Sequence, residues 1–522
     1  MHWAYRIAEE LIRKNPERET FVCASGISPS GSVHIGNFRE VVTTYFVVGA
    51  LQKLGKKTRF IFSWDDFDRF RKVPKNVDPT FEQYIGMPYS DIPCPFGCHS
   101  SYAEHFEKEF EQSLREFGIV PEFIYQNKEY RSRRYNAQIL HALYQRKQIY
   151  DILMAFKTGE PSETERENFY PVNVYCEACQ KDTVNVTAFH NDVLSYACMC
   201  GELNSIDVMK ATNIKLNWKV DWPMRWMTEK VVFEPGGRDH SSATGSYRVS
   251  KEIVSEIFNH QAPQYEPYDF ISIKGTGAKM SSSSGNNITP GELLRIYTPE
   301  VILFMFAKYQ PNAPFHIGLD EDVIRNYTEY ERFSHSERGV LKEEIRDALG
   351  LSVVRGEPRR TPKFNHVANI LPLVNFEASL VREVLGRTGE EYTLEEVGEV
   401  CARAEYWLRN WCPEKVLRVN EKKNQDYYGL LTDTEKEWVR GFVDVLQDET
   451  NPQDDELMRR VYDICHVEDP KMKKNNQKRL FSILYQLVLN SSSGPRIPLL
   501  LHSVGKERLI ALLGQGSKGS KS

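Results

Sequence analysis

The chain is built around the sequence GISPSGSVHIGNFRE, which occupies residues 26–40. An apolar run at residues 21–24 precedes it and has the length of a buried strand. Apolar side chains then recur at helical spacing, at Phe38, Val41, Val42, Tyr45 and Phe46. A strand, a Gly/Ser-rich turn and a helix start direct backbone N–H groups and a helix dipole toward an anion, most often a phosphate. The stretch predicts a phosphate-binding turn, and an ordinary Gly-rich turn between strand and helix is the alternative.

This turn matches neither of the two common phosphate loops. A P-loop has a Lys after its last Gly, and the dinucleotide fingerprint reads G-x-G-x-x-G; residues 26–40 contain neither. Instead, His34 is followed at once by Ile35 and Gly36. An imidazole at a helix start can donate to phosphate oxygens, and a glycine beside it lets an adenine or a ribose approach the backbone. We therefore expect residues 26–36 to contact a nucleotide.

A second candidate stretch reads KMSSSSGN at residues 279–286. It follows an apolar run at residues 270–273, which predicts a strand, and two glycines, Gly275 and Gly277. One Lys in a flexible Gly/Ser loop suits a mobile clamp that brings positive charge to phosphates as they react. Taken alone, such a loop is more often a linker.

Together, residues 34–37 (HIGN) and 279–283 (KMSSS) resemble the paired HIGH and KMSKS signatures of class I aminoacyl-tRNA synthetases. Asn37 replaces the final His and can still hydrogen-bond a ribose or a phosphate. Ser282 replaces the second Lys and carries no charge, so Lys279 is the expected catalytic cation of this signature. Residues 29–40, 63–74 and 237–240 look specifically like the class I lysyl-tRNA synthetases, and the resemblance runs over nearly the whole chain.

The strand pattern predicts an α/β fold with a doubly wound parallel sheet. A second strand is expected at residues 58–63, and it ends at the acidic residues Asp65, Asp66 and Asp68. Clusters of acidic residues more often lie in a solvated turn. However, ligands of open α/β sheets bind at the carboxyl ends of the strands, which is where these three residues are expected. Further helices are expected at residues 104–117, 135–148, 247–259 and 292–309, and residues 270–273 are expected to complete the second half of the sheet.

These patterns suggest five segments. We expect residues 1–157 and 223–290 to form the two halves of a Rossmann-like catalytic domain, with a zinc-ribbon-like insertion at residues 158–222 between them. Residues 291–345 form a connecting helical segment, and residues 346–522 form an all-α domain. Thr432 and Glu435 predict a capping box in that domain. The resemblance implies that it binds the anticodon; a generic helical domain would show the same periodicity.

Two groups of residues have the composition of metal sites. The insertion contains Cys176, Cys179, Cys198 and Cys200. Two sulfur pairs about twenty residues apart are typical of a zinc ribbon, and four thiolates would saturate the ion, so the site is structural. A second group, Cys94, Cys98, His99 and His105, offers two thiolates and two imidazoles. Unligated thiols and a surface histidine are the alternative there, because adjacent Cys98 and His99 need a distorted turn to share one ion.

The composition excludes several classes of protein. The chain has 522 residues, a formal net charge of −5 and ten cysteines. No apolar run reaches the length of a membrane span, and the N-terminus lacks a signal-peptide core. We therefore expect the ten cysteines to lie in a reducing, cytoplasmic compartment, where metal ligation is more common than disulfide bonding. An RNA partner would need a local basic face; the basic residues between Arg131 and Lys147 offer one, and a solvated helix surface is the alternative.

The resemblance implies a function in protein biosynthesis. It implies lysine activation by ATP with Mg²⁺, and transfer of lysine to the 2′-hydroxyl of the terminal adenosine of tRNA(Lys), with neither DNA nor a membrane as partner. It also implies roles for individual residues. His34, Asn37 and Lys279 would be catalytic, and Gly26, Ser28, Asp66, Trp218 and His240 would bind lysine. ATP would contact Pro29, Gly31, His34, Gly36, Asn37, Lys279, Met280, Ser281 and Ser283.

Three alternatives to a lysyl enzyme remain open at this point. A class I synthetase for glutamate, glutamine or arginine would share both signatures. A small-molecule nucleotidylyltransferase would share the turn and the sheet, but would need neither a zinc insertion nor a large helical domain. A catalytically inactive tRNA-binding relative would keep the fold without ATP turnover.

Overall fold

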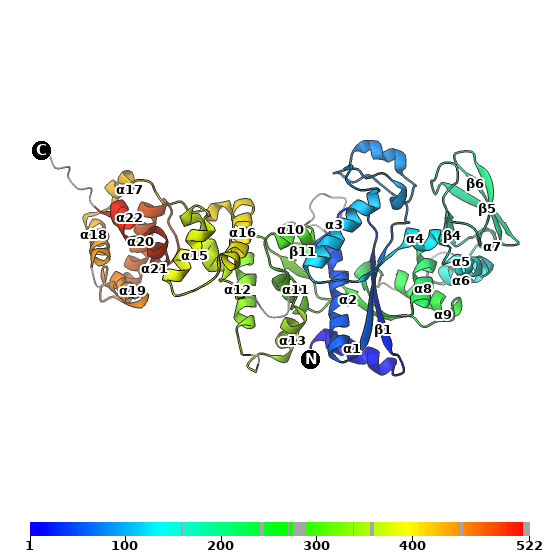
Figure 1. The fold of residues 1–522 in the computed structure, drawn as a ribbon, viewed down its shortest axis with the longest axis horizontal. Coiled ribbons are helices and arrows are strands. Elements are labelled where there is room, and N and C mark those ends of the chain that lie inside the picture. Colours follow the sequence, from blue (N-terminus) through cyan, green and yellow to red (C-terminus); the bar gives the residue numbers. More distant parts are fainter. Residues whose placement is uncertain are drawn as a thin grey trace. The chain divides into compact units, whose positions relative to one another are not determined.

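The structure is a computed structural model. It describes residues 1–157, 160–240, 245–269, 271–274, 288–337, 339–354, 360–448 and 453–514, except for the side chain of Asp239. The chain forms two compact units (Figure 1). The first contains Met1–Leu294, Thr298–Gly318 and Phe333–Gly356, and the second contains Arg295–Tyr297, Leu319–Arg332 and Glu357–Ser522.

A parallel five-stranded sheet forms the centre of the first unit, in the order β10-β9-β1-β2-β3. Its strands are β1 (Thr20–Ile27), β2 (Lys57–Trp64), β3 (Glu122–Tyr125), β9 (Val231–Gly237) and β10 (Gln264–Tyr268). The strand order reverses next to β1, because β2 and β3 lie on one side of it and β9 and β10 on the other. The predicted doubly wound sheet is confirmed, and ligands of such sheets bind at this reversal.

Helices cover both faces of the sheet. Figure 1 shows α2 (Ile35–Lys53) and α8 (Trp218–Glu229) on opposite sides of β1. Phe38 of α2 packs edge-on against Phe110 of α3, while Trp222 and Trp226 of α8 join Val22 and Ala24 of β1 in one buried group. The other helices of this unit are α1 (Trp3–Lys14), α3 (Tyr102–Glu116), α4 (Gln126–Arg131), α5 (Asn136–Tyr144), α6 (Arg146–Ala155), α7 (Glu163–Glu167), α9 (Ser246–Glu256), α10 (Pro290–Leu294), α11 (Pro299–Ala307) and α13 (Glu343–Leu351).

The insertion between β3 and β9 carries its own small sheets. β4 (Val172–Val174) pairs antiparallel with β8 (Ile214–Leu216). β5 (Val184–His190), β6 (Val193–Cys198) and β7 (Leu203–Asp207) form an antiparallel sheet. Side chains from these strands share one core with Phe67 after β2 and with Val220 and Met224 of α8. The insertion therefore supports the α8 side of the main sheet.

Several predicted elements differ from the observed ones. The helix expected at 135–148 is two helices, α5 and α6, because Gln145 has a turn conformation (φ −93°, ψ 10°). The helix expected at 292–309 is α10 and α11, because Pro299 starts a new helix that Thr298 caps. The expected helices at 104–117 and 247–259 are α3 and α9, with shifted ends.

The strand expected to complete the sheet is the clearest error. β11 (Ile271–Ile273) pairs with β12 (Phe315–Ile317) in a separate sheet. The place in the main sheet belongs to β10, which the sequence pattern did not reveal. β10 contains Pro267, and a proline is tolerated there because β10 is an edge strand.

Pro223 lies inside α8, where the sequence suggested only the end of the insertion. A proline has no N–H, so the Lys219 carbonyl loses its helical donor. The Ser250 hydroxyl of α9 donates to that carbonyl at 3.2 Å. Thus α9 completes the hydrogen bonding of α8.

In the second unit, every element over residues 360–448 and 453–514 is a helix. The predicted capping box of Thr432 and Glu435 is confirmed at the start of α18. No helix among the described residues is both long and apolar enough to span a membrane. The helices of this unit are α12 (Asp322–Ser334, of which the last two residues belong to the first unit), α14 (Phe364–Ile370), α15 (Ala378–Arg387), α16 (Leu394–Asn410), α17 (Gln425–Leu430), α18 (Asp433–Gln447), α19 (Asp454–Asp463), α20 (Pro470–Leu489), α21 (Ile497–Val504) and α22 (Lys506–Leu513).

Candidate active site

The predicted nucleotide turn lies at the carboxyl edge of the sheet, between β1 and α2. His34 is the N-cap of α2: its Nδ1 accepts hydrogen bonds from the backbone N–H groups of Gly36 (3.1 Å) and Asn37 (3.3 Å). A neutral imidazole that accepts at Nδ1 carries its hydrogen at Nε2. His34 therefore has a capping role that the sequence analysis did not assign, and its other nitrogen is a donor.

The predicted ATP-binding residues of this turn are all held in one segment. Pro29 and Gly31 are buried, and Gly36 and Asn37 are half-buried. The Tyr102 hydroxyl of α3 donates to the Ser30 carbonyl at 2.8 Å, which fixes the middle of the turn. The predicted contacts from the second signature, Lys279, Met280, Ser281 and Ser283, lie outside the described residues.

Gly26 lies opposite Ser63 in the pairing of β1 with β2. A Cβ atom at this position would be 3.0 Å from the Ser63 carbonyl oxygen, so a larger residue would displace the strand. The Gly26 N–H donates to Glu40 Oε1 at 2.9 Å, and the Tyr268 hydroxyl donates to Glu40 Oε2 at 2.9 Å. Burial raises the pKa of Glu40 to about 8. Glu40 thus connects the ends of β1 and β10, although the sequence offered no signal for that role.

The three acidic residues that follow β2 form ion pairs or hydrogen bonds with other residues of the protein. Asp65 forms an ion pair with Arg225 at 2.7 Å, and Asp68 pairs with Lys215 of β8. Both oxygens of Asp66 accept hydrogen bonds from Asn127, one from the backbone N–H at 2.7 Å and one from the side-chain amide. Asp66 is almost fully buried, and this burial raises its pKa to about 7. Through Asn127, the Asp66 carboxylate binds the first turn of α4. The prediction that Asp66 binds lysine did not include this contact.

A row of three tryptophans lies along α8. Trp218 stacks on Trp222 with ring centres 5.2 Å apart, and Trp222 contacts Trp226 at 4.7 Å. His240 after β9 contacts Trp222 at 5.9 Å. Trp218 is 36% exposed, whereas Trp226 is 1% exposed. The structure therefore brings two predicted lysine-binding residues, Trp218 and His240, against one shared ring, and the row leads from the surface into the core.

The structure brings together the side chains of both predicted metal sites. In each group, the potential ligand atoms all lie within 4.8 Å of one another. In the insertion, Cys176 Sγ is 3.7 Å from Cys200 Sγ, and Cys179 Sγ is 3.6 Å from Cys198 Sγ. In the other group, Cys98 Sγ is 3.1 Å from His99 Nδ1 and 3.2 Å from His105 Nδ1. Gly97 at φ +69° provides the turn that lets Cys98 and His99 face the same point. Each donor set fits one tetrahedral metal ion.

The sequence profile of one family, described as tRNA synthetases class I (K), matches residues 1–350. The chain belongs to this family. Its similarity to curated relatives extends further, over nearly the full length. It is 35% identical to a lysine–tRNA ligase from Treponema pallidum over 98% of both chains. It is 35% identical to one from Borreliella burgdorferi, over 97% of this chain and 98% of that one. A lysine–tRNA ligase from Pyrococcus horikoshii is 33% identical, over 98% of this chain and 99% of its own.

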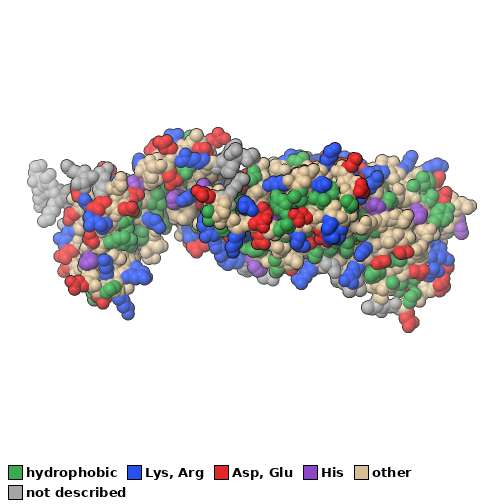
Figure 2. Space-filling model, turned by 90° about the horizontal axis from the view of Figure 1, so that it is seen from below, with side chains coloured by type: hydrophobic (Ala, Val, Ile, Leu, Met, Phe, Trp, Pro, Cys, Tyr) green, Lys and Arg blue, Asp and Glu red, His purple; other side chains and the backbone are tan. Residues whose placement is uncertain are grey.

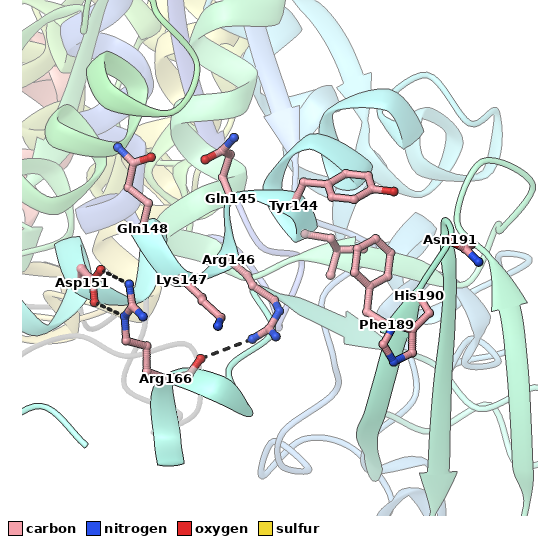
Figure 3. A pocket seen from close by; sticks show the side chains of 11 residues that line it. Tyr144, Gln145, Arg146, Lys147, Gln148, Asp151, Arg166, Phe189, His190 and Asn191 are labelled. Atoms are coloured by element: carbon pink, nitrogen blue, oxygen red, sulfur yellow. Dashed lines mark hydrogen bonds and ion pairs between the residues drawn. The ribbon is translucent and has the colours of Figure 1, made fainter. Parts of the chain in front are cut away.

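The basic segment of this class I synthetase borders a pocket of about 630 Å³ between α5, α6, α7 and β5. Figure 3 shows Tyr144 and Phe189 on one side of it and the ion pair of Asp151 and Arg166 on the other. Lys147 pairs with Glu167, and Arg146 donates to the Glu167 carbonyl at 2.7 Å. Arg146 and Lys147 are therefore already bound within the protein, whereas the ring of Tyr144 is accessible: Tyr144 is 60% exposed.

Proposed function

We propose that this class I synthetase is a lysine–tRNA ligase. It activates lysine with ATP to give lysyl-adenylate and pyrophosphate, and transfers the lysyl group to the 2′-hydroxyl of the terminal adenosine of tRNA(Lys). The observation that carries the proposal is the His34-capped turn at the carboxyl edge of β1, the strand against which Trp222 and Trp226 of the tryptophan row pack. The names of the full-length relatives support the same specificity.

The chemistry needs positioning and charge, and no protein nucleophile. The lysine carboxylate oxygen attacks the α-phosphate of Mg²⁺-bound ATP, and the bond to the pyrophosphate oxygen breaks. His34, Asn37 and Lys279 would meet the charge that develops on the phosphates. Pro29, Gly31, Gly36, Met280, Ser281 and Ser283 would contact ATP. In this scheme Nε2 of His34 donates, because Nδ1 is committed to the helix cap.

The amino-acid side would be formed by Gly26, Ser28, Trp218 and His240. Ser28 and Gly26 are half-buried at the end of β1, and Trp218 and His240 share the Trp222 ring. Asp66 is the weakest member of the predicted set, because Asn127 occupies both of its oxygens. A ring wall with polar groups at its end suits a side chain of four methylenes and an ammonium.

Zinc would serve as a structural ion. Cys176, Cys179, Cys198 and Cys200 would complete its coordination, so the ion would hold the turns of the insertion and offer no open position. Cys94, Cys98, His99 and His105 would hold a second ion ahead of α3. Neither site would take part in a chemical step.

tRNA recognition would be distributed over local contacts. On the face displayed in Figure 2, basic and acidic side chains are interspersed among the described residues. We assign anticodon binding to the helical domain at residues 346–522, joined by residues 291–345 to catalytic halves at 1–157 and 223–290. The basic segment between Arg131 and Lys147 would approach the acceptor end of tRNA, next to the aromatic rings of Figure 3. All these substrates are found in the cytoplasm, where we place the enzyme.

Amino-acid-dependent exchange of pyrophosphate into ATP, across all twenty amino acids and with or without tRNA, tests the proposal. Exchange with lysine is the expected result. Exchange only with glutamate, glutamine or arginine would overturn the specificity and keep the mechanism. No exchange under any condition would favour an inactive tRNA-binding relative, and adenylate transfer to a small molecule without tRNA charging would favour a nucleotidylyltransferase.

A further inference from the structure

One buried arginine connects α2, the helix of the first signature, to two strands outside the main sheet. Arg39 lies one turn into α2 and is 2% exposed. Its guanidinium donates to three backbone carbonyl oxygens, those of Asp269 at 2.7 Å, Gln310 at 2.8 Å and Ala313 at 2.7 Å. The first of these residues precedes β11, and the other two precede β12. Arg39 therefore holds the starts of both strands on α2.

The charge of Arg39 is held without a carboxylate partner. Among the described residues, the guanidinium contacts these three carbonyls and the ring of Phe315, whose centre is 5.1 Å from the guanidinium carbon, and no carboxylate forms an ion pair with it. Burial lowers the pKa of Arg39 to about 10. Burying such a charge costs free energy. In return, the rigid, planar guanidinium fixes several acceptors in one arrangement, which a lysine cannot do.

The strand pair depends on this anchor more than the helix does. β11 and β12 pair only with each other, and hydrogen bonds extend their pairing at both ends: the Asp269 N–H donates to the Pro311 carbonyl at 2.9 Å, and the Lys274 N–H donates to the Ile317 carbonyl at 3.1 Å. A two-stranded sheet is marginally stable by itself, whereas α2 is packed against α3 and buried along most of its length. Loss of the Arg39 contacts would therefore move the strand pair and leave α2 in place.

The second signature, residues 279–283, lies in the sequence between two segments that α2 holds. The pairing of β11 ends at Lys274, five residues before the signature begins. After the signature, the Ile288 carbonyl accepts a hydrogen bond from the Ile35 N–H at 2.9 Å. Ile35 is the first residue of α2 and follows His34, the N-cap. The helix that His34 caps thus holds the chain both before and after the second signature.

We propose that Arg39 is a positioning residue for Lys279: by fixing β11 and β12 on α2, it sets where the cation of the second signature stands relative to the donors of the first. The inference rests on the proposed function, since it takes Lys279 as the catalytic cation. In this scheme Arg39 touches neither substrate. It acts on the rate of adenylate formation through Lys279, and it leaves the binding of lysine to the α8 side of the site.

A double-mutant cycle of Arg39→Met and Lys279→Ala is the direct test. The readout is the single-turnover rate of adenylate formation at saturating ATP and lysine. With Lys279 present, Arg39→Met should lower this rate about 10²-fold, the usual cost of a small misplacement of a reacting group, and change the KM for lysine by less than about twofold. In the Lys279→Ala background, the same substitution should lower the rate by less than about threefold, because the side chain that Arg39 positions is gone. A merely structural role would lower the rate by the same factor in both backgrounds.

Arg59→Met is the matched control. Arg59 lies near the start of β2, away from the carboxyl edge of the sheet, and pairs with Glu122 at 2.6 Å and Glu229 at 2.7 Å. Its loss should lower the unfolding temperature. The rate of adenylate formation should change by less than about twofold, and by the same factor with and without Lys279.

A second variant serves if Arg39→Met does not fold. Phe315→Leu keeps an apolar side chain in β12 and removes the ring beside the guanidinium. We expect it to lower the rate of adenylate formation roughly tenfold, since the guanidinium and its three carbonyls stay in place but are held less firmly. This effect too should disappear in the Lys279→Ala background.

The outcomes separate the inference from the proposed function. If the unaltered enzyme forms no adenylate with lysine, both are overturned. If it does, and Lys279→Ala retains the rate, or Arg39→Met lowers the rate equally in both backgrounds, only the inference is overturned. If Arg59→Met shows the same dependence on Lys279 as Arg39→Met does, the effect comes from general destabilisation and the inference is again overturned.

Discussion

The two sides of the proposed active site are built in different ways. The nucleotide side is one contiguous turn, residues 26–37, and a single residue, His34, caps the helix and is also the proposed donor to the phosphates. The amino-acid side is assembled from β1, β9 and α8, and α8 also contributes Val220 and Met224 to the core of the insertion. The comparison indicates that a change in the turn affects both substrates, whereas a change on the α8 side affects the amino acid alone.

The largest expected effect comes from the insertion. Cys176→Ser should remove one zinc equivalent and lower the free energy of unfolding by several kcal/mol, since structural zinc contributes on the order of 10 kcal/mol to isolated zinc peptides. Cys176 shares a core with Val220 and Met224 of α8, so the KM for lysine should rise more than the KM for ATP. Zinc content and steady-state kinetics measure this. Cys465→Ser, in the helical unit, should leave zinc unchanged; equal zinc loss in both variants would contradict the assignment.

His34→Ala should lower the rate of adenylate formation about 10²–10³-fold, the usual cost of removing one donor to developing charge. It should also cost about 1 kcal/mol of stability through the lost cap. His34→Asn separates these two roles, because asparagine is a favoured N-cap. We expect this variant to recover stability and not rate. Recovery of both would mean that the imidazole serves the helix alone.

The buried carboxyl group of Glu107 in α3 should make the free energy of unfolding depend on pH, and we expect it to contact neither substrate. It is 4% exposed, and its pKa is raised to about 8, first by burial and then by the charges of Asp66 and Glu111, against Lys108, which lowers it. Between the unfolded pKa near 4.5 and about 8, the folded state holds a proton that the unfolded chain has lost. Stability therefore falls by about 1.4 kcal/mol per pH unit as pH rises through this window.

Glu107→Gln should flatten this dependence. The variant and the unaltered protein should unfold alike near pH 5, and the variant should be the more stable near pH 8.5. Thermal unfolding across pH measures this, with Glu116→Gln on the same helix as an exposed control. Parallel curves for the variant and the unaltered protein would contradict the prediction.

The smallest expected effect, that of His240→Ala, distinguishes the amino-acid side of the site from the nucleotide side most directly. His240→Ala should raise the KM for lysine about tenfold, the size of one polar contact, and change the KM for ATP by less than about twofold. His260→Ala, a histidine outside the site, is the control. Equal effects of His240→Ala on both KM values would place His240 outside the lysine pocket.

Sequence patterns predicted the features that depend on neighbouring residues. The turn, the capping box at Thr432 and both Cys/His groups depend on residues a few positions apart or on a known ligand spacing, and the structure brings each together. Glu40 was missed because its partners, Tyr268 and Gly26, come from other elements. Asp66 was assigned by its strand-end position, which cannot tell that Asn127 takes its oxygens. β10 was missed because proline usually argues against a strand.

The hydrogen bond from Ser250 to the Lys219 carbonyl bears on the order in which the protein forms during synthesis. Residues 218–229 leave the ribosome before Ser250, and until then α8 has an unpaired carbonyl four residues before Pro223. The turn between β1 and α2 is closed later still, because the Ile35 N–H donates to the Ile288 carbonyl at 2.9 Å. A growing chain therefore completes α8 once α9 has docked, and completes the turn only after residue 288 has emerged.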